Sequence, residues 1–61
     1  MDGSRIVVPG PDGQRKIDRA EELILLSSGD RERRFLITHP LRLRERAVRL
    51  LVELGAARVE P

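Results

Sequence analysis

The sequence predicts an α+β fold, in which a small antiparallel sheet of three or four strands packs against one C-terminal helix at about residues 40–54. Three observations lead to this prediction. Residues 40–54 carry apolar side chains at helical spacing, shorter β-branched or alternating apolar runs precede them, and Gly, Pro, Ser and Asp separate the runs. With 61 residues, the chain is expected to form a single domain, residues 1–61.

The predicted C-terminal helix has suitable residues at both ends. Pro40 occupies its first position, where a missing N–H costs no hydrogen bond, and Gly55 follows its last residue, where a left-handed backbone can cap the helix. Between them, apolar side chains recur three or four residues apart and form one face: Leu43, Ala47, Leu50, Leu51 and Leu54. We expect this face to be buried.

Short strands are predicted at both ends of the chain. Residues 5–8 are rich in β-branched side chains, and the Pro-Gly-Pro-Asp-Gly sequence of residues 9–13 is typical of a turn. Residues 14–17 would then return beside the first strand and complete a hairpin. After the C-terminal helix, residues 56–60 are expected to add an edge strand.

Residues 18–28 fit two structures. As a helix, the segment would begin with a capping box at Asp18 and end at Gly29. As a strand, residues 23–27 would form a hairpin with residues 33–38. Periodicity does not separate the two alternatives in so short an apolar run, and four consecutive aliphatic residues favour the strand.

Residues 33–38 alternate most clearly, which predicts a strand with Phe35 and Ile37 on one side. Phe35 is the one aromatic residue of the chain, and we expect it in the core beneath the helix. The predicted core combines this strand, the C-terminal helix and one face of the preceding segment: Phe35, Ile37, Leu43, Ala47, Leu50 and Leu54, joined by Leu23 and Leu25 or by Ile24 and Leu26.

Composition places the chain among globular proteins, with 39% hydrophobic and 36% charged residues. A domain this short buries about 60% of the surface that its unfolded chain exposes, so its stability needs an additional source. The chain has 0 Cys, which excludes disulfides and Cys-based metal sites and leaves oligomerisation as the main candidate. Long apolar runs and a secretory signal pattern are missing, so we expect a cytoplasmic protein without a membrane partner.

The sequence offers few groups for catalysis. It contains 0 Cys, 0 Tyr and a single His, His39, which precedes Pro40 and is expected to be a turn or capping residue. No motif indicates a cofactor or a metal, and we expect neither. The protein is therefore predicted not to be an enzyme.

Arginine supplies eleven of the 12 basic residues. Residues 31–49 carry a net charge of +5, in a chain whose net charge is +2. Their guanidinium groups could bind the phosphates of DNA or RNA, or another anion, near the N-terminus of the predicted helix. The alternative is a solvated face that is rich in arginine. The candidate anion-binding or nucleic-acid-binding residues are Arg31, Arg33, Arg34, Arg42, Arg44 and Arg46.

The predicted helix also has more apolar surface than one sheet would cover. Leu41, Val48 and Val52 extend its apolar arc, which Arg44 interrupts. A contiguous exposed apolar surface usually marks an interface, so these three residues predict self-association as a homodimer. The sequence favours a small non-enzymatic interaction or regulatory module that self-associates. The alternative is a small nucleic-acid-binding protein that grips phosphates with its arginines.

Overall fold

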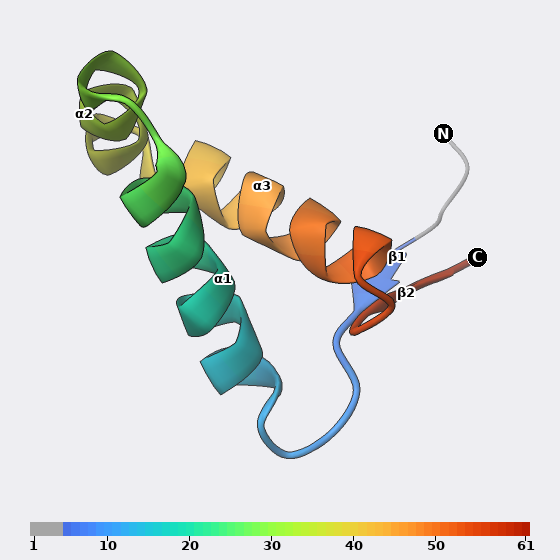
Figure 1. Ribbon diagram of the computed structural model, residues 1–61. Helices are drawn as coiled ribbons and strands as arrows, with labels where there is room; N and C mark the ends of the chain where they lie inside the picture. The colour runs from blue at the N-terminus through green and yellow to red at the C-terminus, as the bar shows by residue number, and fades with distance from the viewer. Residues whose placement is uncertain (1–4) are drawn as a thin grey trace.

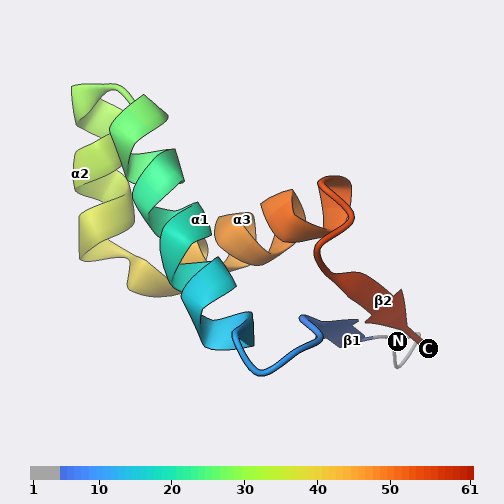
Figure 2. The same cartoon turned by 60° about the horizontal axis from the view of Figure 1, so that its bottom comes forward.

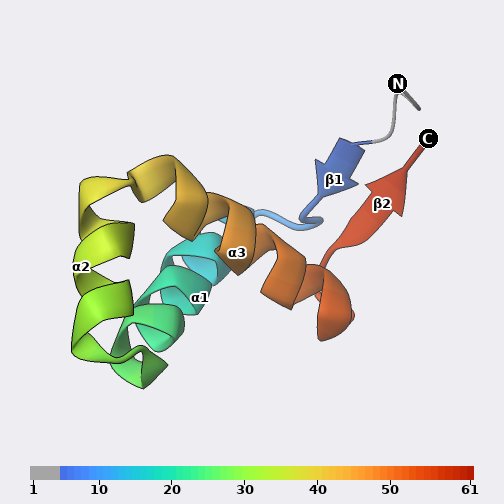
Figure 3. The ribbon, with the colours of Figure 1, turned by 90° about the horizontal axis from the view of Figure 1, so that it is seen from above.

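The computed structural model describes residues 5–61 and has an α+β fold (Figure 1). Its elements in chain order are β1 (Arg5–Val7), α1 (Gly13–Ser27), α2 (Asp30–Thr38), α3 (Pro40–Glu53) and β2 (Arg58–Glu60). α1 packs against α3, α2 connects them at one end, and the strands lie beside the C-terminal end of α3 (Figures 1 and 3). None of the helices in residues 5–61 is long and apolar enough to span a membrane.

The predicted class is confirmed, but the predicted architecture is wrong in its details. Instead of three or four strands and one C-terminal helix, the described chain has a two-stranded antiparallel sheet and three helices. The segments predicted as strands at residues 14–17, 23–27 and 33–38 are all helical. A layer of helix, rather than a sheet, therefore packs against α3.

The sheet joins segments from near the two ends of the sequence (Figure 2). β1 pairs antiparallel with β2, in the register Arg5↔Glu60, Ile6↔Val59 and Val7↔Arg58. The edge strand predicted within residues 56–60 is thus confirmed, whereas the hairpin between residues 5–8 and 14–17 is wrong. Gly10, with a φ of 97°, turns the chain out of β1, and the N–H of Gly13 donates to the carbonyl of Gly10 as α1 begins.

α1 covers the segment that the sequence left open between helix and strand. It begins at Gly13, earlier than the start proposed at Asp18. Its buried residues Ile17, Ala20 and Ile24 lie three and four positions apart, so a single helical stripe faces α3. The helical spacing extends over all 15 residues, and it outweighs the local strand preference of the four consecutive aliphatic residues.

α2 replaces the strand predicted at residues 33–38. Asp30 and Glu32 lie in its first turn, where their negative charges interact favourably with the positive end of the helix dipole. At its other end, the Thr38 hydroxyl lies 3.0 Å from the carbonyl oxygen of Arg34, and the His39 N–H donates to the Phe35 carbonyl oxygen at 2.9 Å. These local hydrogen bonds and charges favour a short helix over an extended strand.

α3 confirms the predicted C-terminal helix at nearly the predicted bounds. Pro40 is at its start, and Gly55 adopts a left-handed φ of 76° just beyond its end. The N–H of Ala56 donates to the Leu51 carbonyl at 2.8 Å, and the N–H of Gly55 donates to the Val52 carbonyl at 3.1 Å. This pair of bonds is a Schellman motif, which satisfies carbonyls that the helix leaves free.

The core differs from the predicted one because α1, and not a sheet, lies against α3. Leu43, Ala47 and Ile24 are buried as predicted, and Leu50 and Leu25 are half-buried at its edge. Phe35, Ile37, Leu54, Leu23 and Leu26 are exposed, which corrects their assignment to the core. The buried cluster contains five large aliphatic residues and three alanines: Ile17, Ala20, Ile24, Leu36, Leu43, Ala47, Leu51 and Ala57.

Candidate functional site

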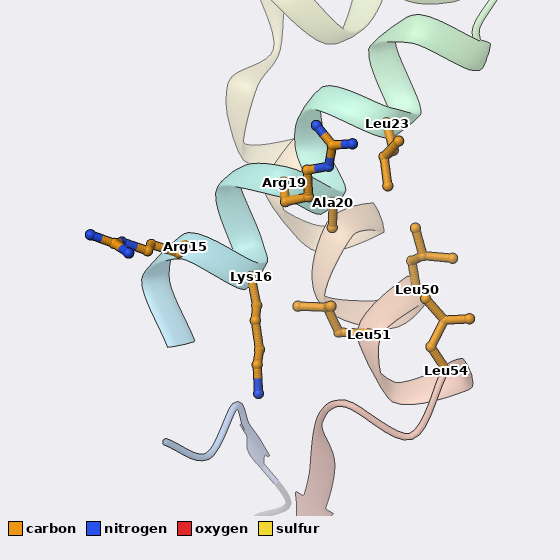
Figure 4. Close-up of a pocket in the computed structure, with 8 residues that line it drawn as sticks. All are labelled: Arg15, Lys16, Arg19, Ala20, Leu23, Leu50, Leu51 and Leu54. Carbon is orange, nitrogen blue, oxygen red and sulfur yellow. The ribbon is translucent and has the colours of Figure 1, made fainter. Parts of the chain in front are cut away.

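An apolar groove runs between α1 and α3 on one face of the molecule (Figure 4). It encloses about 300 Å³, and the surface that lines it is almost entirely carbon. Leu23 comes from α1, Leu50 comes from α3, and Leu54 follows one helical turn later as the C-cap residue of α3. In Figure 4 the three leucine side chains lie toward one another across the gap between the two helices.

The floor of this groove belongs to the core, whereas its walls face solvent. Ala20 and Leu51 are buried beneath it, at 3% and 6% exposure. Leu54 is 69% exposed and Leu23 is 42% exposed, so both side chains keep a large part of their apolar surface in water. The groove is therefore an open continuation of the core between α1 and α3.

Positive charge lies along the α1 side of the groove, from Arg15, Lys16 and Arg19. Lys16 forms an ion pair with Asp12 at 3.7 Å, and Arg19 pairs with Glu22 at 3.1 Å. In Figure 4 Arg15 extends to the side, away from the leucines. Long basic side chains of this kind can cover apolar surface with their stems while their charged groups stay in water.

The predicted anion-binding arginines do not form one patch. Arg46 of α3 forms an ion pair with Glu32 of α2, and Arg42 pairs with Glu45 at 3.6 Å. Arg44 projects into a different hollow, on the side of α3 that faces β1. Arg42 and Arg46 line one hollow in which Glu32 and Glu45 offset their charge, whereas Arg44 lies apart from them.

The remaining three candidates lie on α2. Arg31, Arg33 and Arg34 are exposed, and none of them takes part in an ion pair among residues 5–61. They are spread around a helix that buries Leu36, so they point in different directions over its solvent-facing surface. α2 therefore offers a diffuse positive charge rather than a shaped pocket.

The predicted self-association residues divide between surface and core. Leu41 is 77% exposed, whereas Val48 and Val52 pack partly against the core. Leu41 and Val48 line a hollow of about 450 Å³ together with Ile6 of β1. Charged side chains share the lining of this hollow: Arg44, Glu45 and Arg49.

His39 has the local structural role that the sequence predicts. Its ring stacks on Phe35 with 4.3 Å between centroids, and its Nδ1 lies 3.0 Å from the Phe35 carbonyl oxygen and 3.0 Å from the Thr38 hydroxyl. Residues 5–61 contain no group of three His, Cys, Asp or Glu side chains arranged to hold a metal. Within the same range no polar or charged residue is buried.

Comparisons with protein-family models, with curated proteins and with solved structures find no match to this chain.

The sequence does not predict the groove, because it predicts other surroundings for the three leucines that line its walls. The sequence pattern predicts Leu50 and Leu54 in the core against a sheet, and it favours a strand for the segment that contains Leu23. The helical alternative for residues 18–28 contained the signal that could have found it. On a helix, Arg19, Leu23 and Leu26 fall on one stripe, which would have shown an apolar edge flanked by positive charge.

Proposed function

We propose that this chain is a small non-enzymatic interaction module that acts as a homodimer. The observation that carries the proposal is its accessible surface of 4946 Å². A compact monomer of 6.9 kDa is expected to expose about 4,000 Å² by size scaling. The chain thus exposes roughly 900 Å² more surface than a compact monomer of the same mass, which leaves surface that a partner could cover.

The nature of the exposed surface supports the same proposal. Among residues 5–61, eight large hydrophobic residues are exposed, whereas five large aliphatic residues are buried in the core. Five further large aliphatic residues are partly buried against the core, and scattered exposed leucines are normal in a monomer, but eight exposed large apolar side chains leave much apolar surface without cover in a domain of 61 residues. A second copy would supply that cover and would add stability that a 61-residue core does not provide alone.

The open shape of the chain agrees with this interpretation. Its radius of gyration is 12.2 Å, whereas a compact domain of this length is expected to have a radius of roughly 10.5 Å. One principal dimension is 16 Å, against 35 and 28 Å for the others, so the molecule is a thin slab with two broad faces. A thin molecule buries little apolar surface by itself, and packing one broad face against a second copy would bury more of it.

Sedimentation velocity over a range of concentrations tests the proposal. We expect the sedimenting species to approach twice the 6.9 kDa mass of the chain as concentration rises. The apparent melting temperature should rise with it, because association stabilises the folded state by mass action. A single 6.9 kDa species at several hundred micromolar would contradict the homodimer.

A second candidate function is nucleic-acid binding through α2. The observation in its favour is that Arg31, Arg33 and Arg34 are exposed and take part in no ion pair among residues 5–61. Such arginines could contact phosphates without reading base sequence. We rank this function second because Glu32 and Glu45 lie among the predicted arginines and pair with two of them.

A further inference from the structure

We infer that the groove between α1 and α3 is the place where a second copy of this chain packs, with Leu23, Leu50 and Leu54 of each copy in the contact. This inference rests on the proposed homodimer and assigns its interface. It selects one face from two exposed apolar regions, the groove and the hollow between α3 and β1. The choice depends on which region can be dehydrated at the lower cost.

The groove can lose its water with little penalty. Its lining is almost entirely carbon, and the basic side chains on its α1 side can extend their charged groups to solvent at the edge of a contact. The hollow between α3 and β1 contains Arg44, Glu45 and Arg49 among its lining residues. Covering that hollow would dehydrate charged groups, and a buried charge without a close partner opposes association strongly.

The shape of the groove suits a copy of its own chain. A twofold contact requires a self-complementary surface, because each copy presents the same patch to the other, and a projection beside a hollow is one such surface. Leu54 projects into solvent at 69% exposure, and the hollow lies beside it over Ala20 and Leu51. An apolar side chain that enters the hollow would meet core residues and would extend the existing core across the interface.

Charge at the rim is compatible with the same occupant. Lys16 pairs with Asp12 at 3.7 Å and Arg19 pairs with Glu22 at 3.1 Å, so two of the three cations beside the groove already have a carboxylate partner. Two copies can therefore bring these rims together without strong repulsion between like charges.

Two matched variants, one near each end of α3, distinguish the faces. Leu54→Arg places a charge at the groove, and Leu41→Arg places the same charge at the hollow between α3 and β1. Both leucines are highly exposed, at 69% and 77%, so neither change removes a buried side chain. Leu23→Arg is a second groove variant on α1, and far-UV circular dichroism checks that every variant keeps its helix content.

Sedimentation velocity on the whole chain then gives the result. We expect Leu54→Arg and Leu23→Arg to weaken dimerisation by at least about 30-fold, and Leu41→Arg to change it by less than about threefold. If Leu41→Arg dissociates the dimer and the groove variants do not, the assignment is overturned while the homodimer stands. Equal weakening by both kinds of variant would also overturn it. A wild-type chain that stays monomeric would overturn the homodimer and the assignment together.

Discussion

Arg46 of α3 forms an ion pair with Glu32 of α2, across fourteen positions of sequence. The pair joins α2 to α3, two helices that only His39 separates in the sequence. It adds an electrostatic contact to the apolar packing of the buried Leu36. It also shows why clustered arginines in a sequence do not establish an anion site. A glutamate from a neighbouring helix neutralises one of the cations, and the sequence does not show that the two residues meet.

The stability contribution of this ion pair can be measured with a double-mutant cycle. Both side chains are half exposed, so we expect a coupling free energy of unfolding of about 0.2 to 1 kcal/mol between Glu32→Gln and Arg46→Gln. The coupling should shrink in high salt, because solvent ions screen exposed pairs. Urea denaturation of the four proteins provides the measurement. A coupling of zero at low salt would show that the pair does not link α2 to α3.

Leu36 should be the residue that holds α2 in place. It is 1% exposed, whereas its neighbour Ile37 on the same helix is 59% exposed. Leu36→Ala should lower the free energy of unfolding by about 2 to 5 kcal/mol, since it removes a buried side chain and leaves a cavity. Ile37→Ala, the matched control, should cost much less. Chemical denaturation of both variants tests this, and equal losses would contradict the position of α2.

Substitution of Gly55 should destabilise the fold because of the backbone conformation at this position and not because a new side chain would clash with its surroundings. Its φ is 76°, and no atom beyond Gly55 and its two chain neighbours lies within 4 Å of the place where a Cβ would stand. Gly55→Ala should therefore destabilise the fold by about 1 kcal/mol through left-handed strain alone.

Gly29 is the matched control for this effect. It also has open space around it, but it has a φ of −69° at the N-cap of α2. Gly29→Ser should stabilise the fold by a few tenths of a kcal/mol, because the hydroxyl can accept a hydrogen bond from the first turn. Thermal melts compare the two variants, and a neutral Gly55→Ala would mean that the Schellman motif is not formed.

Nucleic-acid binding, if α2 provides it, should be weak and strongly dependent on salt. Arg31, Arg33 and Arg34 take part in no ion pair among residues 5–61, and if each neutralises one phosphate of duplex DNA, log K against log salt should have a slope of about −2.7. Changing Arg33 and Arg34 to Gln should flatten the slope by about 1.8, while Arg15→Gln on α1 should leave it unchanged. Fluorescence anisotropy with a labelled duplex at several salt concentrations measures these slopes. Undetectable binding at low salt would remove this function.

The sequence predicts α3 well because its signals are local and agree with one another. Pro40 marks the start, Gly55 marks the end, and fourteen residues between them are enough to show helical spacing. β2 is also predicted, although its partner is not. Pairing of β1 with β2 depends on how the three helices bring the two ends together, and a local pattern holds no information on that.

The segments predicted as strands fail for a different reason. Alternation over residues 33–38 is real, but with six residues it also fits a short helix that buries one side chain, Leu36. Phe35 then turns outward and stacks on His39 instead of entering the core. Once α1 and α2 are helices, Leu54 loses the sheet that was expected to cover it, and the exposed groove follows from that change.

Amide chemical shifts in a dilution series test the central claim most directly, because they report both whether copies associate and where they meet. ¹H–¹⁵N spectra would be recorded from tens of micromolar to about one millimolar. We predict concentration-dependent shifts in two segments, around Leu23 in α1 and around residues 50–54 at the C-terminal end of α3, with little change around Leu41. Spectra that do not change over this range would contradict the homodimer, and changes confined to Leu41 and Val48 would contradict the groove as its interface.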